Sequence, residues 1–204
     1  MIHRWDIITL GNLSRNRYWG EGDEAGRRPP LCTCTLVRAE GYNLLVDPSI
    51  SDAERMTAEL DRRTGLTPGQ IDLVFLTHAH GDHHFGLRHF PASRWLAAPQ
   101  VAAAINHDGG YAKKVEGIEN QIEKEIDILH TPGHTLEHYS LRFDCQGYRV
   151  VIAADAAMNR DFWNDRRGYF NTEDPQAAVA SMERLARLAD IIVPGHDNYY
   201  LVNR

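Results

Sequence analysis

Apolar positions along the chain predict a series of β-strands. Residues 32–37 alternate between polar and apolar side chains with a period of two, as in a half-buried strand. The run IDLVFL at 71–76 is continuously apolar, which is typical of a strand in a sheet covered on both faces. We predict further strands over residues 42–46, 94–97, 126–129, 139–143, 150–153 and 191–193.

Capping residues and helical periodicity predict two main helices and one short turn. Ser51 and Asp52 can cap the first helix, and Gly65 ends it. A single helical turn is expected after Thr67, and Asp174-Pro175 opens the second main helix. The positions expected to face the core are Ala53, Met56 and Leu60 in the first helix and Val179, Met182 and Leu185 in the second.

The order of these elements indicates an α/β (α+β) protein. Strands and helices interleave, yet short turns at Gly41 and Gly147 join some strands directly. This favours one or two mixed sheets with helices outside. At about 150 residues per domain, residues 1–204 are expected to form a single domain. Residues 14–31 form a long irregular segment, which we expect to be functional or mobile.

Composition narrows the class of protein. A hydrophobic fraction of 43% with 25% charged residues excludes intrinsic disorder. No apolar run approaches the roughly 18 residues of a membrane span, and we expect neither a secretory signal nor membrane binding. Three cysteines fit a reducing compartment, so a cytoplasmic location is expected. A net charge of −6 argues against a surface that grips nucleic acid throughout.

Histidine is abundant, and several histidines follow predicted strands. The segment THAHGDHH comes directly after the strand at 71–76. It places His78, His80, Asp82 and His83 on one loop. The later candidates are His134 in TPGHT, Asp155 in AAD, and His196 with Asp197 in VPGHD. A glycine before each later histidine is expected to let the backbone turn sharply and bring the imidazole inward.

These residue types favour an open, catalytic metal site. Structural zinc is usually enclosed by four cysteine or histidine ligands, and no cysteine accompanies these motifs. Histidine with carboxylate suits Zn, Fe or Mn. A lone histidine is usually a surface or core residue, but several candidates at strand ends indicate a shared site.

The motifs resemble those of the metallo-β-lactamase superfamily. HAHGDH matches its His-x-His-x-Asp-His signature, and the Gly-His-Thr, the strand-end Asp and the final Pro-Gly-His follow in the family's order. The resemblance extends from about residue 10 to residue 196. It implies a four-layer αββα sandwich, with two mixed sheets, helices outside and the site at the edge where the sheets meet. It also implies two divalent metal ions, with Zn expected and Fe or Mn as alternatives.

The resemblance further implies a role for each motif residue. The first metal would bind His78, His80 and His134, the second would bind Asp82, His83 and His196, and Asp155 would bridge the two. Two metals about 3.5–4 Å apart can hold a hydroxide and polarise a substrate oxygen. Asp82 would also act as the catalytic carboxylate that orients the water. The expected reaction is hydrolysis of an ester, thioester, lactone or phosphodiester.

Residues outside the motifs are expected to support the ligands. Asp47 ends the segment LLVD, where the family usually has an acid behind the metal loop; a turn-forming Asp before Pro48 is the alternative. His138 lies where superfamily hydrolases often carry a supporting histidine. We expect His84 to pack beside the site, and Cys32 to be buried rather than bound to metal.

Departures from the family patterns narrow the choice of reaction. Zinc β-lactamases of the best-known subclass carry Cys at the position of Asp155, and acyl-homoserine lactonases usually carry Tyr at that of Met158. Glyoxalase II enzymes add a C-terminal glutathione-binding domain, which we expect to be missing because eight residues follow His196. The metal motifs and residues 158–196 resemble the small single-domain proteins called metallo-β-lactamase domain-containing protein 1, whose animal members are linked to RNA cleavage.

Three functions stay open at the level of sequence. A hydrolase acting on a small-molecule substrate is favoured, and RNA is a weaker alternative because the acidic chain has no broad basic track. A persulfide dioxygenase-like oxidoreductase would use a single iron, but Asp82, His83 and His196 are all retained. A ligand-binding or regulatory protein with vestigial turnover is the third, and assembly into a homo-oligomer stays open. Residues 14–31 and 158–172 are expected to shape the pocket.

Overall fold

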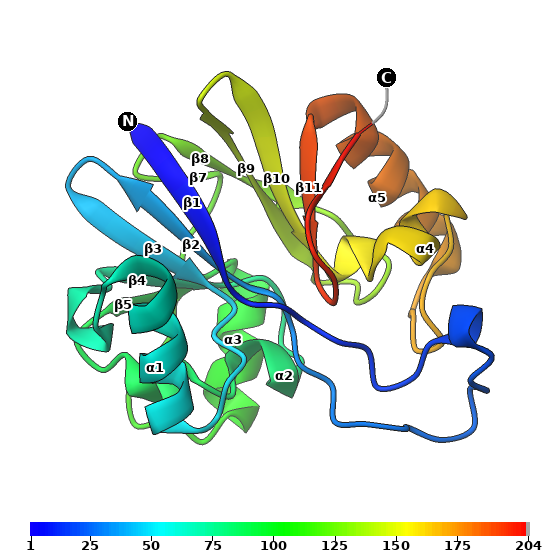
Figure 1. Cartoon of the computed structure of the whole chain (residues 1–204), viewed down its shortest axis with the longest axis horizontal. Helices are drawn as coiled ribbons and strands as arrows, with labels where there is room; N and C mark the ends of the chain where they lie inside the picture. The colour runs from blue at the N-terminus through cyan, green and yellow to red at the C-terminus, as the bar shows by residue number, and fades with distance from the viewer. Residues whose placement is uncertain (203–204) are drawn as a thin grey trace.

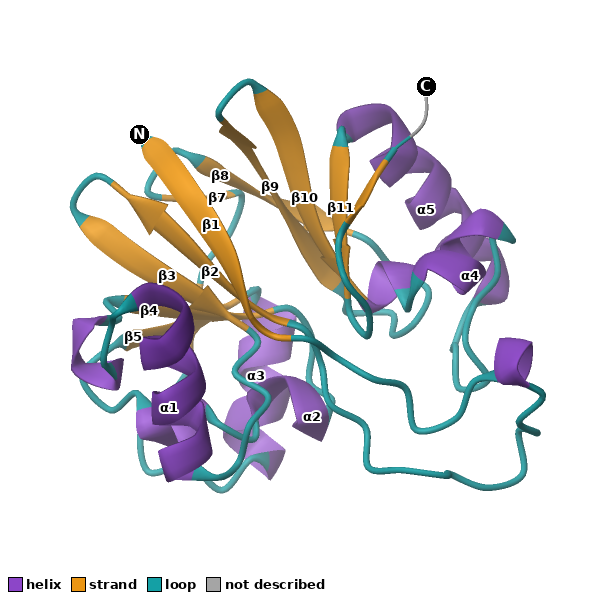
Figure 2. Cartoon of the chain, viewed as in Figure 1, coloured by secondary structure: helices purple, strands orange, loops and turns teal. Residues whose placement is uncertain are grey.

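The protein is a sandwich of two mixed sheets whose outer faces are covered by helices (Figure 1, Figure 2). The computed structural model describes residues 1–202. The sheet strands are β1 (Ile2–Thr9), β2 (Cys34–Ala39), β3 (Tyr42–Val46), β4 (Leu73–Leu76), β5 (Arg94–Ala97), β6 (Glu116–Gly117), β7 (Gln121–Ile122), β8 (Ile126–His130), β9 (Tyr139–Cys145), β10 (Tyr148–Ala154), β11 (Ile191–Pro194) and β12 (Tyr200–Leu201). The order is β1-β2-β3-β4-β5-β6 in one sheet and β12-β11-β10-β9-β8-β7 in the other.

The helices are short and mostly begin at recognisable caps. They are α1 (Ala53–Thr64), α2 (Gly81–His84), α3 (Pro99–Asp108), α4 (Arg160–Asn164) and α5 (Pro175–Leu188), with 3-10 turns η1 (Arg17–Trp19), η2 (Pro68–Gln70), η3 (Leu87–His89) and η4 (Asp155–Ala157). The Asp52 carboxylate accepts a hydrogen bond from Arg55 N at 2.7 Å, and the left-handed Gly65 ends α1, as predicted. Within residues 1–202, no helix is long and apolar enough to cross a membrane.

The core divides into three layers of apolar side chains, which explains the four-layer architecture. Between the sheets, Phe75 of β4 and Phe143 of β9 are fully buried. Met56 of α1 packs with the outer face of the first sheet, and Leu185 of α5 with that of the second. The predicted fold class is therefore confirmed, with two mixed sheets rather than one.

The longest elements that escaped the pattern analysis are β1 and α3, and the shorter α4, β6, β7 and β12 were missed as well. The strand β1 lies at the edge of its sheet and pairs only with β2, so its sequence IHRWDIIT mixes charged and apolar residues without regular alternation. The helix α3 starts at Pro99 and contains a run of alanines, which gives only a weak amphipathic pattern. In addition, part of the motif expected to be one loop, residues 81–84, forms the helical turn α2.

The long segment 14–31 is irregular, as predicted, apart from the single turn η1. Its two ends are joined beside the sandwich, where Asn12 N donates to Leu31 O at 2.7 Å and Leu31 N to Asn12 O at 3.2 Å. Between these ends the chain extends away from the sheets toward α4 (Figure 1). The segment thus forms a wall on one side of the edge where the sheets meet.

We expect the inter-sheet layer to dominate stability. Phe143→Ala should lower the free energy of unfolding by about 3–5 kcal/mol, because it leaves a cavity between the sheets. Tyr148→Ala, on the neighbouring strand but 53% exposed, is the control and should cost about 1 kcal/mol or less. Denaturant titration of both variants measures the difference. Equal losses would contradict this account of the core.

Candidate metal centre

Seven histidine and aspartate side chains converge at the edge where the two sheets meet. They come from five segments, each following a strand or lying in α2. The residues are His78, His80, Asp82, His83, His134, Asp155 and His196. The structure thus brings together every predicted ligand residue, whereas Asp197 points elsewhere and its Oδ2 accepts from Arg160 N at 3.2 Å.

The first group of ligand-type atoms comprises three imidazoles and one carboxylate. His78 Nε2 lies 3.0 Å from His80 Nδ1, and that atom lies 2.9 Å from His134 Nε2. His134 Nε2 also lies 3.1 Å from Asp155 Oδ2. All four ligand atoms fall within 4.8 Å of one another. A zinc ion with bonds of about 2.0–2.1 Å requires ligand separations of this order.

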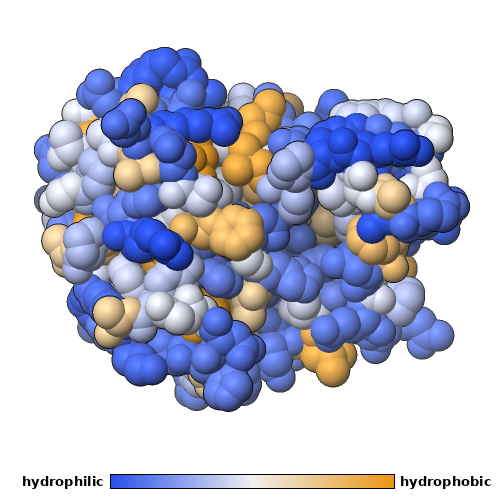
Figure 3. Space-filling view, turned by 90° about the horizontal axis from the view of Figure 1, so that it is seen from below, coloured by the Kyte–Doolittle hydropathy of each residue, from blue (hydrophilic) through white to orange (hydrophobic). Residues whose placement is uncertain are grey.

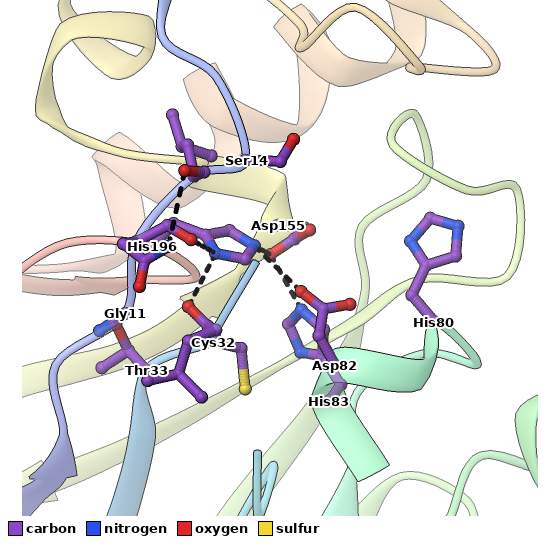
Figure 4. A network of polar contacts seen from close by, with 12 residues as sticks. Gly11, Ser14, Cys32, Thr33, His80, Asp82, His83, Asp155 and His196 are labelled. Atoms are coloured by element: carbon purple, nitrogen blue, oxygen red, sulfur yellow. Dashed lines mark hydrogen bonds and ion pairs between the residues drawn. The ribbon is translucent and has the colours of Figure 1, made fainter. Parts of the chain in front are cut away.

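The second group shares Asp155 with the first. His83 Nε2 lies 3.2 Å and His196 Nε2 lies 3.3 Å from Asp155 Oδ1, the other oxygen of that carboxylate. Asp82 Oδ2 lies 3.8 Å from His196 Nε2. Figure 4 shows His196, Asp155, Asp82 and His83 pointing toward one another. Each oxygen of Asp155 therefore faces a different group.

Two imidazoles form hydrogen bonds through the ring nitrogen that points away from the centre. When the ring is neutral, the other nitrogen is then available to a metal ion. His83 Nδ1 donates to Asp47 Oδ2 at 2.8 Å, and His196 Nδ1 donates to the carbonyls of Asn12 and Leu31, both at 3.0 Å. In a neutral imidazole the inner Nε2 is then an unprotonated lone pair. His83 Nε2 is buried without a hydrogen-bond partner. This is the arrangement that a metal ion requires of its histidine ligands.

The same reasoning applies to His78. The Thr77 hydroxyl donates to Asp47 Oδ2 at 2.7 Å, so its oxygen is an acceptor for His78 Nδ1 at 3.2 Å. His78 Nε2 consequently faces His80 and His134 as a lone pair. Three ring nitrogens that meet at about 3 Å cannot all be satisfied by donating to one another. A divalent cation among them fits these donors.

Burial and neighbouring charges shift the pKa values of the side chains at the centre in different directions. Burial, with a further contribution from His83, holds the pKa of His78 well below its ordinary value, and burial also lowers that of His80. Burial alone would raise the pKa of Asp155, but His196, His83 and His134 hold it well below its usual range. Cys32, Asp155 and Asp47 raise the pKa of His83 against the effect of its burial, and Asp155 and Asp82 raise that of His196, so these two imidazoles hold protons where a metal ion would bind.

Asp47 ends β3 directly behind the metal loop. It accepts hydrogen bonds from Thr77 N at 2.9 Å and from His83, and it is 1% exposed. Its φ of +52° is unusual for a residue other than glycine. The sequence pointed to Asp47 but not to Thr77, whose only signal is its place immediately before the motif.

Three other residues, which the sequence predicts to support the site or pack near it, lie around the centre. His138 is buried, with its ring centroid 5.0 Å from that of His78 and Nδ1 2.9 Å from Thr131 Oγ1. It therefore touches a ligand residue by packing and not by a hydrogen bond. His84 turns away to the Tyr111 hydroxyl at 2.8 Å. Cys32 is buried as expected, and burial raises the pKa of its thiol to about 12.

The glycines before the later histidines have different functions. Gly133 has a φ of +140°, and its missing side chain makes room for Ala178. Gly195 lies in a turn, as expected, but does not have a positive φ. A Cβ there would overlap Asp155 Oδ1, so close approach is the requirement. Ala154, immediately before Asp155, has a φ of +45°, a strained conformation that directs the carboxylate into the site.

A pocket of about 370 Å³ opens over the two groups. Its floor includes His80, Asp82, His134, Asp155 and His196, and its walls are largely apolar, with Leu13, Pro30, Phe85, Met158, Tyr169 and Phe170. Figure 3 shows this side of the molecule, with apolar surface beside a central hollow. Segments 14–31 and 158–172 both contribute, as predicted. Trp163 instead packs on Tyr200, with ring centroids 5.8 Å apart.

Comparisons with known proteins agree with this geometry. The metallo-beta-lactamase superfamily profile matches residues 27–196. The hydroxyacylglutathione hydrolase of Aeromonas hydrophila is 31% identical over 190 residues, which cover 91% of this chain and 62% of that protein. Metallo-beta-lactamase domain-containing protein 1 of Rattus norvegicus is 30% identical, over 69% of this chain and 55% of its own length. The chain thus spans between half and two thirds of these relatives.

A solved structure shares the fold across nearly the whole chain. An N-acyl homoserine lactone hydrolase, with the product N-hexanoyl-L-homoserine at its catalytic metal centre, matches with a TM-score of 0.73 and 22% identity. The match covers 97% of this chain and 94% of that one. The profile match, the named hydrolases and the convergence of the motifs at one sheet edge lead to a single conclusion. The chain belongs to the metallo-beta-lactamase superfamily.

Proposed function

We propose that this protein is a dinuclear zinc hydrolase that cleaves a small ester, thioester or lactone. The observation that carries the proposal is the placement of Asp155, whose two oxygens face two separate sets of donors. A mononuclear iron site would leave the Asp82, His83 and His196 group without a purpose. Nitrogen and carboxylate donors without thiolate suit catalytic zinc, with Fe or Mn as alternatives.

The proposal assigns a role to each side chain at the metal centre. One ion would be held by His78, His80 and His134, the other by Asp82, His83 and His196, and both by Asp155. When bound, the two ions would supply the Lewis acidity that activates water and polarises the substrate oxygen. Asp47 and the Asn12 and Leu31 carbonyls hold protons on the outer nitrogens of their histidines, which orients the rings.

The pocket supports an acyl substrate. The Asp82 carboxylate lines the pocket and would accept a hydrogen bond from the attacking water. The apolar walls at Leu13, Phe85 and Met158 would enclose a hydrocarbon portion and exclude bulk water. Two of the similar proteins are named as hydrolases of acyl compounds, a hydroxyacylglutathione and an N-acyl homoserine lactone.

The first prediction concerns metal content. Tag-free protein should contain about two zinc ions per chain by elemental mass spectrometry, and Asp155→Ala should lose metal and about 100-fold or more of its ester hydrolysis. His84→Ala is the matched control, because that imidazole bonds to Tyr111 and should leave the metal content near two. Two ions and full activity in Asp155→Ala would overturn the bridging role. About one iron per wild-type chain would favour the oxidoreductase.

The second prediction tests the close approach at Gly195. Gly195→Ala should displace the Asp155 carboxylate and lower metal content without removing any ligand atom. Gly69→Ala is the control, since the nearest atom to a Cβ there is 4.0 Å away. Elemental analysis and thermal melting with and without a chelator would measure both variants. Retention of two ions by Gly195→Ala would show that the carboxylate tolerates the shift.

The third prediction concerns the apolar walls. If they enclose the acyl chain, kcat/KM for p-nitrophenyl hexanoate should exceed that for the butanoate by about fifteenfold, because each buried methylene contributes about 0.8 kcal/mol. Phe85→Ser should reduce this ratio, whereas Leu201→Ser, 60% exposed and outside the pocket, should not. A ratio near one in the wild-type protein would rule out an acyl chain in this pocket.

A further inference from the structure

A second cleft adjoins the pocket over the metal centre, and the proposed chemistry makes no use of it. It has a volume of about 540 Å³ and lies between the segment 14–31 and the turn that follows α4. Its lining includes Arg17, Asp23, Phe162, Arg167, Tyr169 and Phe170. Tyr169 and Phe170 line both cavities, so a ligand can extend from one to the other along this aromatic edge.

The guanidinium groups at this cleft have no carboxylate partners. Arg17 and Arg167 line the cleft, Arg15 lies beside it and donates to Asp23 O, and none of the three forms an ion pair with any of residues 1–202. The Arg15 guanidinium lies over the Phe170 ring, 3.6 Å from its centroid, and its buried Nε has no acceptor. Asp23 supplies the one carboxylate of the lining. The cleft therefore presents more positive than negative charge, in a chain whose net charge is −6.

Neighbouring acids that could have neutralised these arginines are engaged elsewhere. Glu21 pairs with Arg28 and also accepts from Asn16 N at 2.6 Å. Asp165 accepts from the Tyr18 hydroxyl at 2.6 Å. Arg17 and Arg167 thus keep their donors available to an incoming anion.

The aromatic edge between the cavities is fixed in place. The Tyr169 hydroxyl donates to Arg15 O at 2.8 Å and accepts from Arg15 N at 3.3 Å. Phe170, 45% exposed, supports the Arg15 guanidinium. Because these contacts join the segment 14–31 to the segment after α4, the spacing between the metal pocket and the arginines is built into the fold.

We propose that this cleft binds a phosphate or carboxylate at the far end of the substrate, while the acyl group of the same substrate enters the apolar pocket. The proposal rests on the proposed hydrolase function and specifies its substrate class, an acyl ester or thioester with an anionic tail. Planar guanidinium groups bind phosphate and carboxylate through paired hydrogen bonds, which a neutral tail could not form.

Direct binding tests the cleft without requiring turnover. Phenyl phosphate and phenylacetate are titrated calorimetrically into the metal-loaded protein, the Arg17→Gln/Arg167→Gln double variant and the Arg160→Gln control, whose arginine lies outside the cleft. At least one anion should bind the wild type and the control equally, and the double variant about tenfold or more weakly. The anion that binds identifies the tail as phosphate or carboxylate. Equal affinities in the wild type and the double variant, or no saturable binding, would overturn the proposal.

A pair of thioesters then connects the cleft to catalysis. Hexanoyl-pantetheine and hexanoyl-4′-phosphopantetheine differ only in a terminal phosphate. Wild type and Arg160→Gln should hydrolyse the phosphorylated thioester with about tenfold higher kcat/KM, and the double variant should lose this preference while it keeps its rate on the neutral one. An equal preference in all three proteins would contradict a phosphate tail in the cleft.

The two experiments separate the failure of the hydrolase from the failure of the cleft. Hydrolysis of neither thioester, with anion binding that still depends on Arg17 and Arg167, would refute the hydrolase and retain the anion site. Hydrolysis of both at equal rates, without anion binding, would retain the hydrolase and refute the cleft.

Discussion

The structure depends on one buried negative charge, the carboxylate of Asp155. An isolated ionised carboxylate in a protein interior is costly, and this one is nearly inaccessible to solvent. Protons or metal ions shared with the imidazoles on both sides would balance this charge. The strained Ala154 directs the carboxylate inward, and Gly195 leaves room for it. Those imidazoles turn a ring nitrogen toward the carboxylate. The whole edge of the sandwich is therefore arranged to surround positive charge.

Hydrogen bonds to the outward-facing nitrogens of the imidazoles make that arrangement rigid. Asp47 reaches from the end of β3 to both Thr77 and His83, so one carboxylate fixes the loop after β4 and a ring on α2. On the opposite side, the Asn12 and Leu31 carbonyls hold His196. Asn12 lies just before the irregular segment 14–31 and Leu31 is its last residue, and the two are paired with each other. The segment that shapes the pocket thus also orients a proposed metal ligand.

From the sequence, the residues of this site are easier to predict than the elements and backbone contacts around them. Side chains that follow strands gather at a sheet edge, so the spacing of the motifs predicted a cluster there, although it also included Asp197, which lies apart. The clustered residues are His78, His80, Asp82, His83, His134, Asp155 and His196. The contributions of Asn12 and Leu31 come from backbone carbonyls, which carry no residue-type signal. The edge strand β1 and the helix α3 lack the regular apolar pattern that marks elements covered on one face. The close approach at Gly195 appears only when β10 and β11 are paired in space.

The proposed metal ligands and the walls of the two cavities lie on different parts of the fold. The groups proposed to bind metal lie on strand ends that the packed core holds in place, since any shift would disturb the layer around Phe75 and Phe143. The walls of the pocket and of the adjoining cleft lie on segments outside the sheets, joined through Tyr169 and Arg15. Substitutions in these segments can change charge and apolar area without touching Asp155. In the proposed function, one catalytic edge would serve acyl substrates with different tails, and Arg17 and Arg167 would select for a negative one.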